Sequence, residues 1–118
     1  MAATGQPQIA EALKHLWQKF LPQMQERVAV LEGANRALEA GSLSDEQRRA
    51  AAAAAHKLAG VLGTFGLTEG TTLAREAEET YTTGSPHDSA VASRLSAHTR
   101  QLSDLIQKHH QNLTGEPQ

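Results

Sequence analysis

The chain has 118 residues, a formal net charge of −2 and no cysteine. Its length allows one hydrophobic core but not two, so we expect one domain over residues 1–118, with residues 1–6 and 114–118 disordered. The charge gives no indication of a nucleic-acid or membrane-surface partner, and the lack of cysteine excludes a disulfide framework and thiolate chemistry. No apolar run is long enough to span a bilayer, and we expect no signal peptide, because no basic segment followed by an apolar one opens the sequence. We therefore expect a cytoplasmic, monomeric protein.

Apolar residues recur at helical spacing along the chain and predict an all-α protein. A short first helix covers residues 9–20, and Pro22 should kink or end it because proline lacks the amide proton that a helix interior needs. A second helix covers residues 21–38, and Gly41 can take the left-handed conformation that ends it. Asn35 falls on the apolar seam of this helix, so it needs a buried polar partner or lies at the seam's edge.

A capping box begins the third helix. In Ser44-Asp45-Glu46-Gln47, the serine side chain can accept from the amide three residues on, and the glutamine side chain can accept from the serine amide. Six alanines then lead to His56, and alanine is the best helix former. Gly66 is a natural left-handed cap at the end of the helix.

His56 lies at the centre of a helix face that carries only small residues. Successive residues turn by about 100°. The small residues within about 60° of the histidine are Ala52, Ala53, Gly60 and Gly63. The opposite face carries an apolar core stripe, namely Ala51, Ala55, Leu58, Leu62 and Phe65. Glycine inside a helix costs about 0.5–1 kcal/mol relative to alanine, so the small-residue strip indicates either a partner that comes close or tight packing between helices.

Three cations lie near the histidine in the sequence. Lys57 is about 100° round the helix from His56, so its long side chain can reach a group held by the imidazole. Arg48 and Arg49 lie about two turns earlier. We interpret both arginines as solvated charges, although Arg49 projects within about 20° of the histidine and could meet an acidic rim on a partner.

The turn at Gly66 brings two helices side by side. His56 is eleven residues before Leu67, and Glu78 is eleven residues after it, so an antiparallel hairpin places the two side chains at the same height. A carboxylate there can accept the proton of one imidazole nitrogen and leave the other nitrogen as a nucleophile. Glu79 is the second candidate for this role. The alternative interpretation is that both glutamates are solvated.

The remaining sequence completes a bundle. Gly84 can end the fourth helix, and Ser85-Pro86-His87-Asp88 is a strong start for the last one. His98 falls on the apolar stripe of that last helix. His109 and His110 are adjacent and point in different directions, which is poor geometry for a metal site. The spacing predicts an antiparallel up-down-up-down four-helix bundle with an additional short N-terminal helix.

The string His56-Lys57-Leu58-Ala59-Gly60, followed by Gly63, Phe65, Gly66 and Leu67, resembles the histidine-containing phosphotransfer (HPt) domain. The resemblance covers this helix, the next helix to about Glu79, and the overall length and helix order. It implies a four-helix bundle that relays phosphoryl groups between response-regulator aspartates, with His56 as the phosphorylated residue and Lys57 and Gly60 as its usual neighbours. Many members have a second lysine three residues after the histidine, where this chain has Ala59.

The resemblance also implies the partners and the docking surface. The partners are receiver domains of response regulators, with a hybrid histidine kinase as a further candidate. Magnesium is expected on the receiver, which supplies most of the charge stabilisation, and no cofactor is expected on this chain. The family often has a hydrogen-bonding side chain, commonly glutamine, at the place of Glu78, and its short first helix contributes to docking. The candidate docking residues are Gly60, Gly63, Ala52, Ala53 and Arg49.

Neither GxGxxG nor GxxxxGK[ST] occurs in the sequence, so nothing indicates nucleotide binding. We therefore expect a phosphocarrier without kinase activity of its own rather than an enzyme. Two interpretations compete with it. One is a helical adaptor that docks a partner without chemistry at His56. The other is a metal-binding bundle, but such sites pair Glu-x-x-His motifs on facing helices, and no such motif occurs.

Overall fold

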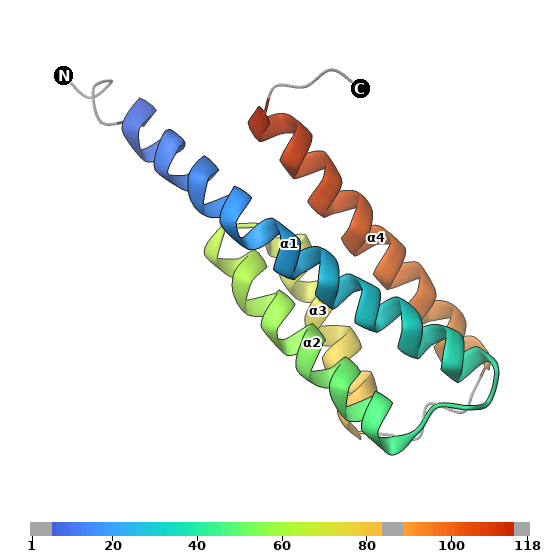
Figure 1. Ribbon diagram of the computed structural model, residues 1–118. Helices are drawn as coiled ribbons and strands as arrows, with labels where there is room; N and C mark the ends of the chain where they lie inside the picture. Colours follow the sequence, from blue (N-terminus) through green and yellow to red (C-terminus); the bar gives the residue numbers. More distant parts are fainter. Residues whose placement is uncertain (1–5, 84–88, 115–118) are drawn as a thin grey trace.

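The computed structural model describes residues 6–83 and 89–114, which form four α-helices. They are α1 (Gln6–Glu39), α2 (Asp45–Thr64), α3 (Thr68–Thr83) and α4 (Ser89–Thr114). Each helix packs against two neighbours, in the order α1–α2, α2–α3, α3–α4 and α4–α1, and consecutive helices run in opposite directions (Figure 1). The described part of the chain is thus an antiparallel up-down-up-down bundle, as the apolar spacing predicts.

The expected short N-terminal helix is not a separate element. α1 is continuous, with Pro22 inside it, so the predicted break is wrong. Proline removes one helix hydrogen bond, here the bond to the carbonyl of Gln18. Both residues are exposed, so water can solvate that carbonyl. Trp17 before the proline and Met24 after it are fully buried, and their packing holds both halves of α1 on the same bundle.

The predicted ends of the helices around α2 are confirmed. Gly41 and Gly66 both have a φ of +72°, in the left-handed region that glycine enters without a Cβ clash. At the start of α2, the Gln47 amide donates to Ser44 Oγ at 3.0 Å, and the Ser44 amide donates to Gln47 Oε1 at 2.8 Å. Both halves of the capping box are therefore formed.

Some expectations concern the termini and the α3–α4 connection. Gln6 and Thr114 are helical, so the predicted disorder is wrong for these two residues. The other residues of those tails lie outside the described ranges, as do Gly84 and the segment 85–88.

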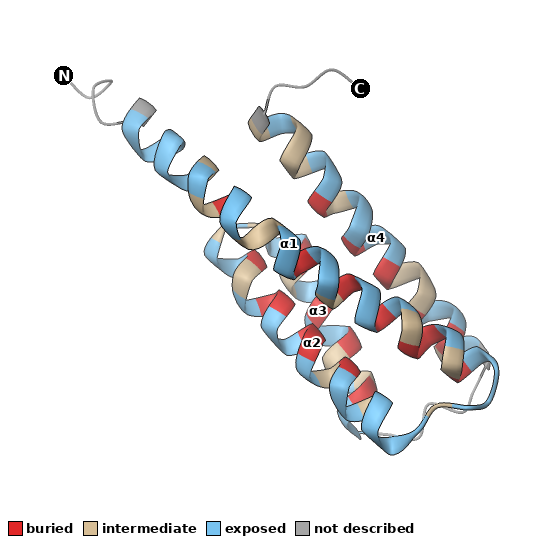
Figure 2. Cartoon of the chain, in the orientation of Figure 1, coloured by how far each residue is buried: buried red, intermediate tan, exposed pale blue. Residues whose placement is uncertain are grey.

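The core is built from the inner faces of all four helices (Figure 2). Its largest fully buried side chains are Trp17, Tyr81, Met24, Leu31, Leu58, Leu62, Leu95 and Leu102. Each such apolar side chain contributes about 1.5–3 kcal/mol through burial. Asn35 is buried on the seam, as predicted, and has Thr99 as a hydrogen-bond partner. No helix in the described ranges is long and apolar enough to cross a membrane.

α1 and α4 are longer than the α2–α3 hairpin and extend past its turn (Figure 1). Trp17 closes the bundle at this end. Its ring lies edge-on to Phe65, with centroids 5.1 Å apart, and to His109, with centroids 4.5 Å apart. Its Nε1 donates to Nδ1 of His110 at 3.3 Å. One side chain therefore joins α1, α4 and the C-terminal end of α2.

Candidate functional site

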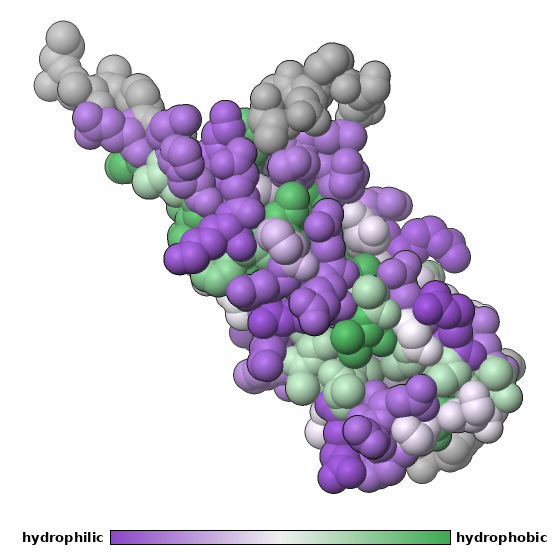
Figure 3. Space-filling model, viewed as in Figure 1, coloured by the Kyte–Doolittle hydropathy of each residue, from purple (hydrophilic) through white to green (hydrophobic). Residues whose placement is uncertain are grey.

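α2 presents His56 on its outward face, where the side chain is 73% exposed. Ala53, Gly60 and Gly63 are also exposed, whereas Ala52 is half-buried and packs against the core. A Cβ added at Gly60 would meet nothing within 4 Å. Figure 3 shows pale green surface, which is moderately hydrophobic, along α2 beside α1 and between hydrophilic side chains. The imidazole therefore stands on a low surface that a partner can approach.

Glu78 on α3 holds the histidine ring. His56 Nδ1 and Glu78 Oε2 are 2.9 Å apart, so the contact predicted from equal offsets about the turn is present. The Glu78 side chain is 31% exposed. Glu79, the second candidate, is exposed, and the contact with His56 is made by Glu78 instead. Because a carboxylate can only accept, Nδ1 is the donor, and Nε2 carries the lone pair of the neutral ring.

A groove of about 340 Å³ runs between α1 and α2 beside the histidine. Its lining residues are Phe20, Gln23, Arg27, Lys57, Gly60, Val61, Thr64 and Phe65. Lys57 and Gly60 thus belong to both the predicted site and this groove. The resemblance implies a contribution from the first helix, but the α1 residues that line the groove do not follow from the sequence, because pairing Phe20 with Phe65 requires the relative rotation of two helices, which neither stripe specifies alone.

The first turn of α2 carries two arginines that share Asp45. Nη2 of Arg48 lies 2.8 Å from its Oδ1, and Nε of Arg49 lies 3.3 Å from its Oδ2. The hydrogen bond from Arg48, and then the charges of Arg49 and Arg48, lower the pKa of Asp45. Arg49 is exposed. Arg48 is half-buried, and its Nη1 donates to the Tyr81 carbonyl at 2.7 Å, so its interpretation as a solvated charge is wrong.

The other described histidines have different surroundings. His15 is as exposed as His56, at 74%, but its Nε2 is 4.0 Å from Glu11 on the same helix. His98, His109 and His110 are half-buried on α4, and His87 lies outside the described ranges. Within those ranges no three histidine or acidic side chains are grouped so that they could hold a metal ion. Of the histidines that can be compared, His56 alone combines exposure with a carboxylate from a neighbouring helix.

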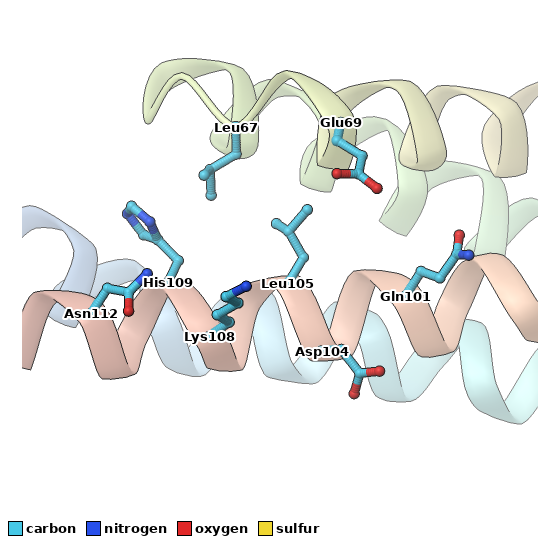
Figure 4. Close-up of a pocket in the computed structure, with 8 residues that line it drawn as sticks. All are labelled: Leu67, Glu69, Gln101, Asp104, Leu105, Lys108, His109 and Asn112. Atoms are coloured by element: carbon cyan, nitrogen blue, oxygen red, sulfur yellow. The ribbon is translucent and has the colours of Figure 1, made fainter. Parts of the chain in front are cut away.

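A second hollow, of about 360 Å³, lies between the start of α3 and the C-terminal half of α4. Leu67 and Leu105 face each other across it, with His109 beside them (Figure 4). Polar side chains, among them Glu69 and Lys108, complete the lining. None of these residues belongs to the small-residue strip, so this hollow is not part of the His56 face.

The fold and the site together define a class: a helical bundle that holds one exposed histidine with a carboxylate behind it and an open approach in front. The model of the family described as "Hpt domain" matches residues 15–113. The chain therefore belongs to the Hpt domain family, whose members carry phosphoryl groups in two-component phosphorelays.

Protein RcaC of Microchaete diplosiphon is 37% identical to the chain over 74 residues, which make up 63% of this chain and 11% of that protein. The chain thus spans a small part of the length of this relative. No solved structure matches the chain significantly.

Proposed function

We propose that the chain is a histidine phosphocarrier in which His56 accepts a phosphoryl group from a receiver aspartate and donates it to another. The observation that carries the proposal is the 2.9 Å contact between Nδ1 of the exposed His56 and Glu78. It leaves Nε2 as the nucleophile in a chain of the Hpt family. Family membership by itself supports phosphotransfer, and this contact supports the assignment to one residue and one ring nitrogen.

The reaction exchanges one bond at phosphorus for another. The Nε2 lone pair attacks the phosphorus of a phosphoaspartate in line. The bond from phosphorus to the carboxylate oxygen breaks, the aspartate leaves as a carboxylate, and the ring keeps its Nδ1 proton against Glu78. Lys57 supplies a cation to the phosphoryl oxygens, while magnesium on the receiver supplies the remaining charge stabilisation. The reverse reaction passes the group to a second receiver.

The partner docks on the face that surrounds His56. Gly60, Gly63, Ala52 and Ala53 allow its backbone to approach, and Arg49 meets an acidic rim. The groove beside Lys57 extends this face onto α1 and offers an apolar lining for a partner side chain. A receiver domain, alone or within a hybrid histidine kinase, is the proposed partner. The carrier acts as a cytoplasmic monomer and has neither a cofactor nor kinase activity of its own.

The direct test is label transfer from a receiver domain phosphorylated on its aspartate. Wild-type protein should acquire acid-labile label, and His56→Gln should acquire none while remaining folded, because an exposed position tolerates substitution. His15→Gln is the matched control, since His15 is equally exposed and also lies near a glutamate. Label on a folded His56→Gln protein would refute the assignment, as would loss of label in His15→Gln.

A helical adaptor that docks a receiver without chemistry is the second candidate. The small-residue strip and the groove support it equally well, because both features concern approach rather than reaction. It predicts that the wild-type protein binds a receiver and never becomes labelled. Measuring binding and label in the same samples separates the two functions.

A further inference from the structure

Glu78 can hold His56 only if α3 keeps one height and one rotation against α2. If the register of α3 against α2 shifted by one residue, the side chain facing His56 would be displaced by about 1.5 Å along the axis and about 100° around it. The apolar stripe of α3 opposes large rotations, but small shifts change apolar burial little because burial is not directional, whereas they change the length and angle of a hydrogen bond at once. The groups that fix α3 therefore also fix the geometry of the proposed phosphoryl site.

Tyr81 ties α3 to two other helices through the core. It lies three residues after Glu78, close to one turn, and is fully buried. Its hydroxyl donates to Oδ1 of Asn35 on α1. Asn35 Nδ2 donates to Oγ1 of Thr99 on α4 at 2.8 Å, and Thr99 Oγ1 donates to the Leu95 carbonyl at 2.8 Å. Burial raises the pKa of Tyr81 to about 12, so the hydroxyl remains a donor at physiological pH.

The hydrogen bonds of the Tyr81–Asn35–Thr99 network depend on direction, whereas the apolar contacts of the surrounding core do not. Asn35 and Thr99 are nearly as buried as Tyr81, at 4% and 3% exposure. Every deeply buried side-chain polar atom in the described ranges has a partner. A slide or rotation of α3 would separate the Tyr81 hydroxyl from Asn35 and leave polar atoms unpaired in the core, which is costly.

Arg48 ties the same residue of α3 to α2. The Tyr81 carbonyl is one of the last four of α3, which have no amide partner within the helix. Arg48 Nη1 donates to it at 2.7 Å, and Asp45 holds the guanidinium at 2.8 Å from Nη2. A cation at a helix C-terminus is also favourable for the helix dipole. Arg48 lies eight residues before His56 on α2, so it connects the helix of the histidine to the end of the helix of the glutamate.

We infer that Arg48 and the Tyr81–Asn35 pair are positioning residues for the proposed transfer: they fix α3 against α2 and thereby keep Glu78 on Nδ1 of His56. None of them touches the histidine or the phosphoryl group, so each acts through Glu78. The inference rests on the proposed function for its effect on the rate, but its effect on the ring can be observed without phosphate.

The test uses two variants of the full chain, Tyr81→Phe and Arg48→Met. The first removes only the hydroxyl, and the second keeps an apolar stem in place of the guanidinium. Two readouts are taken on each: the ¹⁵N signals of the His56 ring, which report the share of rings with the proton on Nδ1, and the rate of label transfer from a phosphorylated receiver. Both variants should lose part of the Nδ1–H signal, and both should transfer about 3- to 10-fold more slowly.

The controls cause comparable changes away from the network. Ile106→Val removes a methyl group from a buried α4 side chain and is a mild core destabilisation of a general kind. Arg75→Met removes an exposed arginine of α3. Both should leave the ring signals and the rate at the wild-type values.

The inference is overturned if Tyr81→Phe and Arg48→Met give the same ring signals as their controls, or if the controls shift those signals equally. If the wild-type protein accepts no label at all, the proposed function fails. The ring signals still decide the positioning role in that case.

Discussion

Among single residues, Lys57 is the one cation next in sequence to His56, and the structure leaves it exposed at the edge of the groove. If its ammonium group binds the phosphoryl oxygens, Lys57→Ala should slow transfer without abolishing it. A hydrogen bond to a charged group is worth about 1.5–3 kcal/mol, which corresponds to roughly 10- to 150-fold in rate. Single-turnover label transfer from a phosphorylated receiver measures this change.

Lys108→Ala is the matched control, because it removes an exposed lysine that lies on α4 and lines the other hollow. It should transfer at the wild-type rate. A Lys57→Ala protein that transfers at full speed would remove this lysine from the mechanism. Ala59 stands where many family members have a second lysine, so α2 carries no second lysine that could replace Lys57.

At the residue scale, the sequence predicts contacts that follow from regular helix geometry. The His56–Glu78 pair is correct because it needs only a helix, a short turn and equal offsets on both sides of it. Arg48 was misjudged because its acceptor is the backbone carbonyl of Tyr81, and no side-chain pattern marks such an acceptor. The α1 residues that line the groove beside Lys57 could not be predicted, because they depend on the rotation of α1 against α2.

At the scale of one element, α2 has a buried face for the core and an open face for a partner. Gly60→Leu should leave the fold intact, since a Cβ there meets nothing within 4 Å and leucine is the better helix former. The new side chain would fill the approach beside His56. Overpacking a contact costs about 1–3 kcal/mol, so binding of the receiver should weaken roughly 5- to 150-fold, as titration with a receiver domain would measure.

Gly33→Leu places the same side chain in the interior of α1, where a Cβ would meet only an Arg36 side-chain nitrogen at 3.9 Å. It should bind the receiver as the wild type does. Thermal melts of both variants check that neither substitution unfolds the bundle. Wild-type affinity in a folded Gly60→Leu protein would mean that the small-residue strip has no docking role.

The helix boundaries illustrate which parts of an element can be predicted. Gly41 and Gly66 were correct as stops because a left-handed residue is a local requirement. Pro22 was wrong as a stop because its effect is not local. Proline costs the helix one hydrogen bond, but Trp17 and Met24 on either side of it are buried in the core. This packing stabilises the continuous helix by more than the lost bond costs, because most helix stability in proteins comes from tertiary packing.

On the scale of the whole molecule, the bundle has two ends that differ. One end carries the α1–α2 connection, and the other is closed by the aromatic contacts of Trp17 with α2 and α4. The apolar spacing of the first helix favours Trp17 as a core or bundle-capping residue, but it does not specify which residues of the other helices Trp17 meets. The contact between Trp17 and His109 therefore could not be inferred from sequence, although it joins residues on the first and last helices.

The burial of His109 predicts that the stability of the bundle depends on pH. Partial burial lowers the pKa of His109 below its ordinary value of 6.5, because burial disfavours the charged ring. The unfolded chain therefore takes up this proton more readily than the folded one. The contribution of His109 to stability is complete above the unfolded pKa, near 6.5, and is lost as the pH falls from there through the folded pKa.

The measurement is the free energy of unfolding in urea at pH 7.5 and pH 5.5, followed by the fluorescence of Trp17, the single tryptophan of the chain. Wild-type protein should lose more stability between the two pH values than His109→Gln, whose side chain does not titrate. Lys108 and Glu69 line the same hollow as His109, and His110 accepts a hydrogen bond from Trp17. These three residues are unchanged in both proteins. His15→Gln, which changes an exposed histidine of α1, should retain the wild-type loss. An equal loss in wild type and His109→Gln would show that the proton is taken up elsewhere in the molecule.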